Sequence, residues 1–317
     1  MNRGNQILIG VLVLQIVLAV VLFWPQQSAT VAGQPLFAEL ETDQVDQVTI
    51  TDGVGEHVVL SRSGASWVLA EAGNYPVRDG VVDELLLKIA ALKADRPVTQ
   101  TRASLARLQV SEDEYAFQVV MRLQDRSLLT LYVGSSPSYG TTHVRVANQN
   151  QVYLASDLSS ADVSTQLSGW IDTTYFSLQE QEIVAVTLAN KNGTFEFVRQ
   201  GTAWTMDGLG EGETVADAVV DTLVSRATLI RMVRPLGTEP MASYGMHAPN
   251  AVLVLRAQTP EGTQLTYTLQ VGAQSGQDGS YVLKSSESPY YVHVAEYTVT
   301  DWVDKTRDDF LEQPETE

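Results

Sequence analysis

The chain has 317 residues, no cysteine, and 38 acidic against 20 basic residues, which give a formal net charge of −18. This balance argues against a nucleic-acid ligand, because binding to a phosphate backbone depends on clustered Lys and Arg, and the chain has no run of them. The lack of cysteine excludes disulfides, thiolate metal sites, a cysteine nucleophile and lipid attachment at a lipobox, and it fits an exported protein.

An apolar stretch of 18 uncharged residues runs from Ile7 to Trp24. At 1.5 Å per residue it spans about 27 Å, close to the hydrocarbon thickness of a bilayer. Arg3 precedes it and the next basic residue is Arg62, so the positive-inside rule places the N-terminus in the cytoplasm and the bulk of the chain outside. We expect residues 1–24 to be a single-pass anchor in the cell membrane, followed by a linker over 25–44. A cleaved signal peptide is the alternative, with a small-residue cleavage site at Thr30-Val31-Ala32.

Residues 45–178 are expected to form a first α+β module. Short apolar runs separated by Gly turns predict a β-meander with strands at 45–51, 57–62 and 67–69. The stretch Val81 to Pro97 predicts an amphipathic helix that Asp79 caps and that ends at the Arg96-Pro97 pair. Its apolar face has the i, i+3, i+4, i+7 spacing and consists of Val82, Leu85, Leu86, Ile89 and Leu92. Next come a helical turn at 104–108, strands at 115–123, 128–133, 143–147 and 152–155, and a weak helix over 159–167.

The second half of the chain repeats this pattern, because the stretch from Val81 to Pro97 recurs from Val219 to Pro235 at an offset of 138 residues. Trp67, Gly134, Tyr153 and Trp170 have counterparts at nearly the same offset in Trp204, Gly272, Tyr291 and Trp302. Residues 179–312 are therefore predicted to form a second module, followed by an acidic tail over 313–317. Its strands are expected at 186–188, 194–199, 252–256, 265–271, 281–283 and 290–293. Its helix is expected to run through Ile230 from a cap at Thr214 and to stop at the Arg234-Pro235 pair.

The predicted fold class is α+β, with two tandem repeats preceded by one transmembrane helix. Each repeat has a β-meander, an amphipathic helix and a further antiparallel four-stranded segment, and its helices cover one face of the sheet. Trp67 and Trp204 follow Gly turns in strands, so we expect them to be core anchors of their meanders.

Several motifs together resemble those of an uncharacterised bacterial domain-of-unknown-function family. They are the meander Trp, the helix ending in a basic residue and Pro, and the segments 244–249 (YGMHAP), 269–272 (LQVG), 280–283 (SYVL) and 290–293 (YYVH). Family members have one N-terminal span and an exported, often tandem α+β region. Their genes often lie beside a gliding-type ABC exporter, which implies an accessory subunit of an ABC-type membrane complex. The first repeat departs from the pattern, because Leu108-Gln109-Val110 lacks both the Gly and the Pro.

No nucleotide-binding loop, nucleophile elbow or zinc-protease motif is present, and the resemblance carries over no catalytic residue. His143 and His293 are expected to be surface histidines in strands, and no pair of histidines has metal-ligand spacing on a helix. The acidic groups at 112–114 and 308–309 are expected to be solvated charges rather than a calcium site or an acid/base pair.

We therefore predict no enzyme activity, no cofactor and no metal, and a membrane-anchored binding or scaffold module with a membrane-protein partner. Its candidate binding surface consists of tyrosines in the second half of each predicted sheet: Tyr132, Tyr153, Tyr281, Tyr290 and Tyr291. Two alternatives stay open, namely an exported hydrolase of envelope glycan or peptide that uses two carboxylates, and a solute-binding protein released by signal cleavage.

Overall fold

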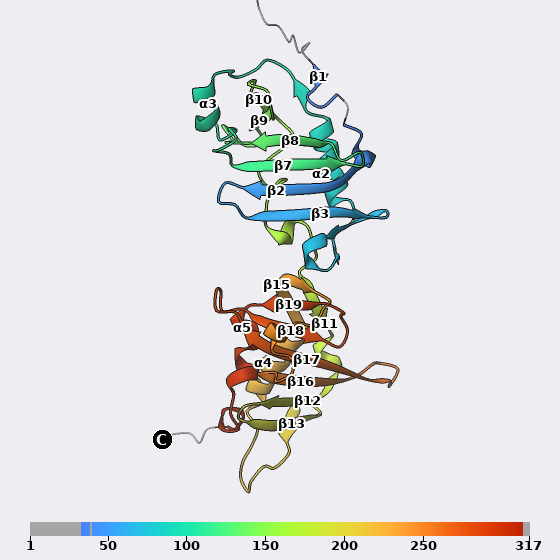
Figure 1. Cartoon of the computed structure of the whole chain (residues 1–317). Helices are drawn as coiled ribbons and strands as arrows, with labels where there is room; N and C mark the ends of the chain where they lie inside the picture. The colour runs from blue at the N-terminus through green and yellow to red at the C-terminus, as the bar shows by residue number, and fades with distance from the viewer. Residues whose placement is uncertain (1–32, 39, 313–317) are drawn as a thin grey trace, which may run out of the picture.

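The computed structural model describes residues 33–38 and 40–312. This part of the chain is rich in β-sheet, with few helices, and its two large sheets belong to two halves that lie end to end in Figure 1. The predicted span from Ile7 to Trp24 and the acidic tail lie outside the described residues. Within them, no helix has the length and apolar character needed to cross a bilayer.

The first sheet has eight strands, and every neighbouring pair is antiparallel. In spatial order they are β10 (Tyr153–Ala155), β9 (Thr142–Val146), β8 (Leu128–Val133), β7 (Phe117–Leu123), β2 (Val45–Asp52), β3 (His57–Ser63), β4 (Ser66–Leu69) and β5 (Tyr75–Pro76). A separate two-stranded sheet pairs β1 (Gln34–Pro35) with β6 (Lys93–Ala94). In β2, Val48 and Ile50 alternate and are fully buried on the face turned to the core. Val45 is fully buried as well, although it lies three residues before Val48, because the register shifts between Val45 and Gln47.

The second sheet has nine strands, again antiparallel throughout. In spatial order they are β11 (Thr174–Ser177), β15 (Leu229–Gly237), β19 (Tyr291–Val294), β18 (Tyr281–Ser285), β17 (Gln264–Gln274), β16 (Ala251–Gln258), β12 (Ile183–Asn190), β13 (Gly193–Gln200) and β14 (Ala203–Met206). The strands predicted from alternation and turn residues in both halves are confirmed to within one to three residues at their ends.

The described helices are α2 (Val81–Ala90), α3 (Arg102–Arg107), α4 (Asp217–Thr228) and α5 (Glu296–Asp304). Short 3-10 helices occupy Thr42–Gln44, Ala70–Ala72, Leu167–Gly169, Glu180–Glu182, Ala242–Tyr244 and Asp308–Phe310. The predicted apolar face of α2 is confirmed, because Val82, Leu85, Leu86 and Ile89 are buried in the core. In Figure 1, α2 lies against the first sheet and α4 and α5 lie against the second.

The predicted ends of these helices are wrong. α2 ends at Ala90 and α4 at Thr228, each well before its Arg-Pro pair. Pro235 lies inside strand β15, where the register shifts, and a bulge is a place where a sheet accepts proline. The predicted caps Asp79 and Thr214 also fail, since Gly80 and Ala216 precede the helices and neither makes a side-chain cap.

Three further sequence expectations differ from the structure. The weak helix over 159–167 is absent from the described fold, where that stretch has a turn at residues 160–163 and irregular backbone up to the 3-10 helix that begins at Leu167. Part of the predicted linker is docked, because β1 pairs with β6 and the Phe37 side chain is buried. Strand β11 belongs to the second sheet, although it precedes residue 179, where the second module was predicted to begin. Strands β1, β6 and β11 have only two to four residues and therefore little periodicity, which explains why the sequence did not predict their pairings.

Each half carries the same polar clamp on its meander tryptophan. Trp67 and Trp204 are buried, which confirms them as core anchors, and each indole Nε1 donates a hydrogen bond to an aspartate of the following helix. The acceptors are Asp83 at 3.0 Å and Asp221 at 2.8 Å. An arginine guanidinium lies over each indole ring, 4.6 Å from its centre at Trp67 and 4.5 Å at Trp204.

The two halves contact each other directly. The rings of Tyr75 and Tyr290 pack edge to face with centroids 4.7 Å apart, and the Tyr290 hydroxyl donates to the carbonyl of Asn74 at 3.2 Å. Beside them the backbones approach so closely that a Cβ added to Gly73 would lie 2.8 Å from the Cα of Gly237. These contacts place the second sheet next to the turn that follows β4.

Candidate functional site

The two sheets differ at one edge. In the second sheet, β19 pairs with β15 through Met232↔Val294, Arg234↔His293 and Pro235↔Val292. In the first sheet, β6 has two residues and pairs only with β1, so its ladder does not continue to β10 in the described structure. An isolated bridge between Thr99 and Val152 closes one end of this opening. We call the opening between Lys93–Asp95 and Leu154–Asp157 the seam.

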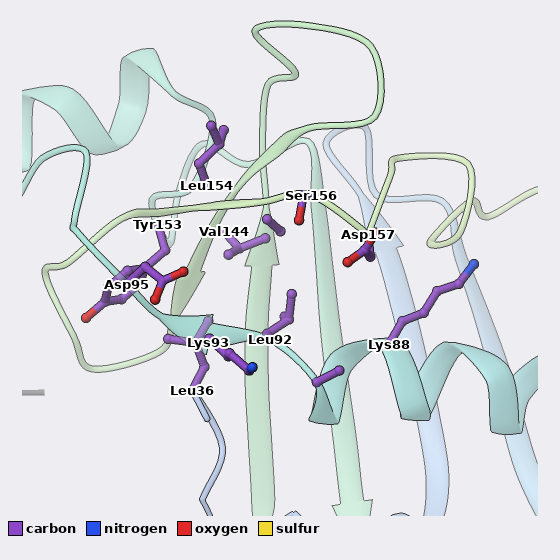
Figure 2. Close-up of a pocket in the computed structure, with 12 residues that line it drawn as sticks. Leu36, Lys88, Leu92, Lys93, Asp95, Val144, Tyr153, Leu154, Ser156 and Asp157 are labelled. Atoms are coloured by element: carbon purple, nitrogen blue, oxygen red, sulfur yellow. The ribbon is translucent and has the colours of Figure 1, made fainter. Parts of the chain in front are cut away.

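The seam contains a cavity of about 360 Å³ (Figure 2). Its apolar wall includes Leu36, Leu92, Val144 and Tyr153, and Lys88 lines it from α2. This volume lies near the lower end of the range for small-molecule and cofactor pockets. The seam is therefore both a gap in backbone pairing and a hollow with an apolar wall.

The backbone of Leu154 faces this hollow. On the neighbouring strand β9, the His143 N–H donates to the Ser135 carbonyl at 3.1 Å, and the His143 carbonyl accepts from the Gly134 N–H at 2.8 Å. Because both His143 groups point to the far side, the opposed pair Leu154↔His143 is a non-hydrogen-bonded pair of the antiparallel ladder. The N–H and C=O of Leu154 therefore point away from β9.

Val152 lies two residues before Leu154, so its backbone shows to which side the Leu154 N–H and C=O point. The Val152 N–H donates to the Thr99 carbonyl at 3.0 Å, and the Val152 carbonyl accepts from the Val98 N–H at 2.8 Å, so Val152 turns toward the chain that follows β6. Leu154 lies two residues further along and presents its backbone to the same side. Across the described residues, its N–H and C=O have no backbone partner. Its side chain is 47% exposed.

Some charged side chains around the seam have ion-pair partners and others have none. Lys88 Nζ bonds Asp162 at 2.7 Å and Glu84 at 3.0 Å, and these hydrogen bonds, the one to Asp162 foremost, raise the pKa of Lys88. Lys93, Asp95 and Asp157 make no side-chain hydrogen bond or ion pair with any other described residue, and all three are exposed. Figure 2 shows Asp95 and Asp157 at opposite ends of the cavity. The unpaired charges of the seam are thus two carboxylates and one ammonium.

Sequence differences at the 138-residue offset explain why the seam is open. Asp95 corresponds to Val233 in β15, Ser156 to Val294, the last residue of β19, and Asp157 to Ala295, which follows that strand. Aspartate is disfavoured in strands, whereas valine is favoured, so the first half loses strand propensity on both sides of the same ladder. The sequence contained this difference in strand propensity between the halves, but the tyrosine pattern did not point to the seam.

The structure does not bring the five predicted tyrosines together. Tyr132 and Tyr153 are 5% and 2% exposed, so their rings are part of the protein interior. The Tyr132 ring packs under the Arg145 guanidinium at 4.5 Å, and Tyr153 lies in the seam wall. Tyr290 is half-buried at the contact between the halves, and Tyr281 and Tyr291 are half-buried on the second sheet. Of the five, Tyr153 alone is part of the seam.

The expectation of surface histidines is wrong for His143 and His293, which are both buried. His293 Nδ1 lies 2.7 Å from Ser280 Oγ, and Ser280 Oγ donates to Asp278 at 2.6 Å. Here the serine lies between the other two groups, whereas a hydrolytic triad needs the histidine in the middle. Burial, and then the neighbouring Arg234, lower the pKa of His293. The described residues contain no group of three His, Asp or Glu side chains placed to hold a metal ion.

Comparison with known protein families gives a match to this chain. A family model described as "Domain of unknown function (DUF4340)" matches residues 67–234, which is more than half of the chain. The match begins at the clamp residue Trp67 in β4 and ends at Arg234 in β15, so it reaches from the first sheet into the second. No curated protein matches the chain.

Proposed function

Because the chain belongs to the DUF4340 family, whose description assigns no activity, we propose its function from the seam: a binding and scaffold module for a protein partner. In this proposal residues 7–24 anchor the chain in the cell membrane as one span. The bulk lies on the extracytoplasmic side, and the partner is a subunit of an ABC-type membrane complex. The apolar length of that stretch and the charge difference around it support the anchor.

The observation that carries the proposal is the unpaired backbone of Leu154 beside an apolar hollow. A strand edge with free N–H and C=O groups is a template for pairing with another chain, and natural proteins usually cover such edges. The second sheet of this protein covers its own corresponding edge with β15. The first sheet leaves it open, next to the docked segment β1.

The proposal includes a duplication with divided roles. We infer that the two halves descend from one unit, which the 138-residue offset and the two Trp–Asp–Arg clamps support. The half with the closed ladder serves as the scaffold, and the half with the open seam receives the partner. The tyrosine and glycine contacts between the halves hold one against the other.

Photocrosslinking in native membranes tests this function. A photoreactive amino acid replaces Leu154 in the full-length chain, and the matched control carries it at Val198, which is 48% exposed on β13 of the second sheet. We expect a covalent adduct with a transporter subunit from position 154 and none from position 198. Recovery of the uncrosslinked chain alone from position 154, or equal adducts from both positions, would count against the proposal.

A further inference from the structure

We propose that the seam binds an extended segment of its partner as an added β-strand, and that this segment alternates apolar with basic side chains. This inference rests on the proposed function in that the partner is a protein. It goes further by stating the conformation and the chemistry of the segment that is bound.

The conformation follows from the backbone. Strand addition uses main-chain hydrogen bonds for affinity and pockets for alternate side chains for specificity. Leu154 offers one N–H and one C=O to the hollow, and neither is satisfied by another described residue. In the second sheet the residue at the same offset, Val292, has a strand beside it, namely β15. This edge of the fold is therefore a pairing edge, and in the first half the corresponding strand β6 does not pair with it.

The apolar positions follow from the alternation of side chains along β10. Tyr153 and Ala155 are buried and face the core, whereas Leu154 between them is exposed. A strand added beside β10 turns every second side chain toward the same interior face. There it meets the wall formed by Leu36, Leu92 and Val144. Apolar side chains at alternate positions fit this wall.

The basic positions follow from the charges. Lys88 is already neutralised by Asp162 and Glu84, while Asp95, Asp157 and Lys93 have no ion-pair partner in the described structure. With two unpaired carboxylates against one unpaired ammonium, the seam has a net negative charge. Asp95 and Asp157 stand at opposite ends of the cavity in Figure 2. Opposite charge across an interface sets register and partner choice. Two carboxylates at the two ends of the cavity therefore select lysine or arginine on the segment between them, and the chain's net charge of −18 favours the approach of a basic segment.

The test uses the full-length chain in detergent and two fluorescent ten-residue peptides, one alternating valine and lysine and one alternating valine and glutamate. Fluorescence anisotropy measures binding to the wild type and to Leu154→Pro, with Leu154→Ala as the matched control. Proline removes the leucine side chain together with the N–H that faces the seam, and edge strands accept proline at such positions. Leu154→Ala removes the same side chain and keeps the amide.

We expect the valine–lysine peptide to bind the wild type and Leu154→Ala with similar affinity, and to bind Leu154→Pro at least tenfold more weakly. The double variant Asp95→Asn with Asp157→Asn is expected to reduce the affinity severalfold. The valine–glutamate peptide is expected not to bind. Equal binding to the wild type and Leu154→Pro would show that the peptide attaches by charge alone, and this result would overturn the proposal.

Hydrogen exchange gives a second readout that does not depend on the folding of any variant. In the wild type, we expect the Leu154 amide to exchange at least tenfold more slowly when the valine–lysine peptide is bound. Unchanged exchange at Leu154 under saturating peptide would overturn strand addition. If the chain instead dimerised with protection of Leu154 in the absence of peptide, a second copy would be the occupant and the inference would be wrong.

These outcomes are separable from those of the crosslinking experiment. A transporter subunit crosslinked at position 154, without protection of the Leu154 amide by peptide, would leave the proposed function in place and refute strand addition. Peptide binding with amide protection, without a crosslinked transporter subunit, would support the strand site and refute the assignment to a transporter complex.

Discussion

The clamp on the meander tryptophan gives a quantitative prediction. Asp221 accepts the hydrogen bond from the Trp204 indole at 2.8 Å and pairs with Arg199 at 3.5 Å. The Asp221→Ala change leaves a buried indole N–H without an acceptor, which costs about 1–3 kcal/mol. The ion pair adds at most about 1 kcal/mol, because the Asp221 side chain is 45% exposed. We expect a loss of about 2 kcal/mol in the free energy of unfolding, equivalent to about 4–8 °C in Tm for a domain of 150–250 residues.

Thermal unfolding followed by circular dichroism measures this loss, with Trp204→Phe and the double variant completing a double-mutant cycle. The matched control is Asp304→Ala, which removes an aspartate whose ion pair with Lys191 is exposed on both sides and is expected to cost less than about 0.5 kcal/mol. Asp83→Ala in the first half is expected to behave like Asp221→Ala. The reasoning would be refuted if Asp221→Ala were no worse than the control, or if the effects of Asp221→Ala and Trp204→Phe were additive.

Two further predictions concern the contact between the halves and the response to acid. Gly73→Ala places a Cβ 2.8 Å from the Cα of Gly237, so it should lower Tm clearly more than Gly64→Ala, a control with the same positive φ and open space around it; equal shifts would show that the halves do not press together there. The Arg307 guanidinium, through side-chain hydrogen bonds, lowers the pKa of Glu213 from 4.5 to about 2, so the stabilisation from this pair is complete above pH 4.5 and is lost as the pH falls toward 2. Glu213→Gln should therefore lower Tm at neutral pH and make Tm depend less on pH between 4.5 and 2, and an unchanged pH profile of Tm would contradict this.

Periodicity predicted the parts of the fold that bury a continuous face. The face of α2 is right because its apolar side chains recur at helical spacing over ten residues. The end of the second helix is wrong because proline was taken as a helix stop. From Leu229 onward the chain alternates, with Ile230 and Met232 buried and Leu229 and Val233 exposed, which is the period of a strand. The alternation was present in the sequence, but the expected helix boundary obscured it.

The candidate site was less accessible to sequence reasoning. Aromatic residues in strands suggested a surface, yet Tyr132 and Tyr153 are interior because they lie on the core-facing side of their strands or under another side chain. The seam depends on which backbone groups remain unpaired, and no single residue type signals this. What the sequence does contain is a contrast between halves, since Asp95 and Asp157 stand where the second half has Val233 and Ala295.

The position of Leu36 in the cavity wall limits how far the cavity can lie from the membrane. Leu36 follows Trp24 by 12 residues, and a chain of that length reaches at most about 40 Å when fully extended. If Trp24 marks the membrane surface, the hollow lies at most about 40 Å from the lipid headgroups. A partner that fills it must then present its segment close to its own membrane-embedded part, rather than at the tip of a tall outer domain.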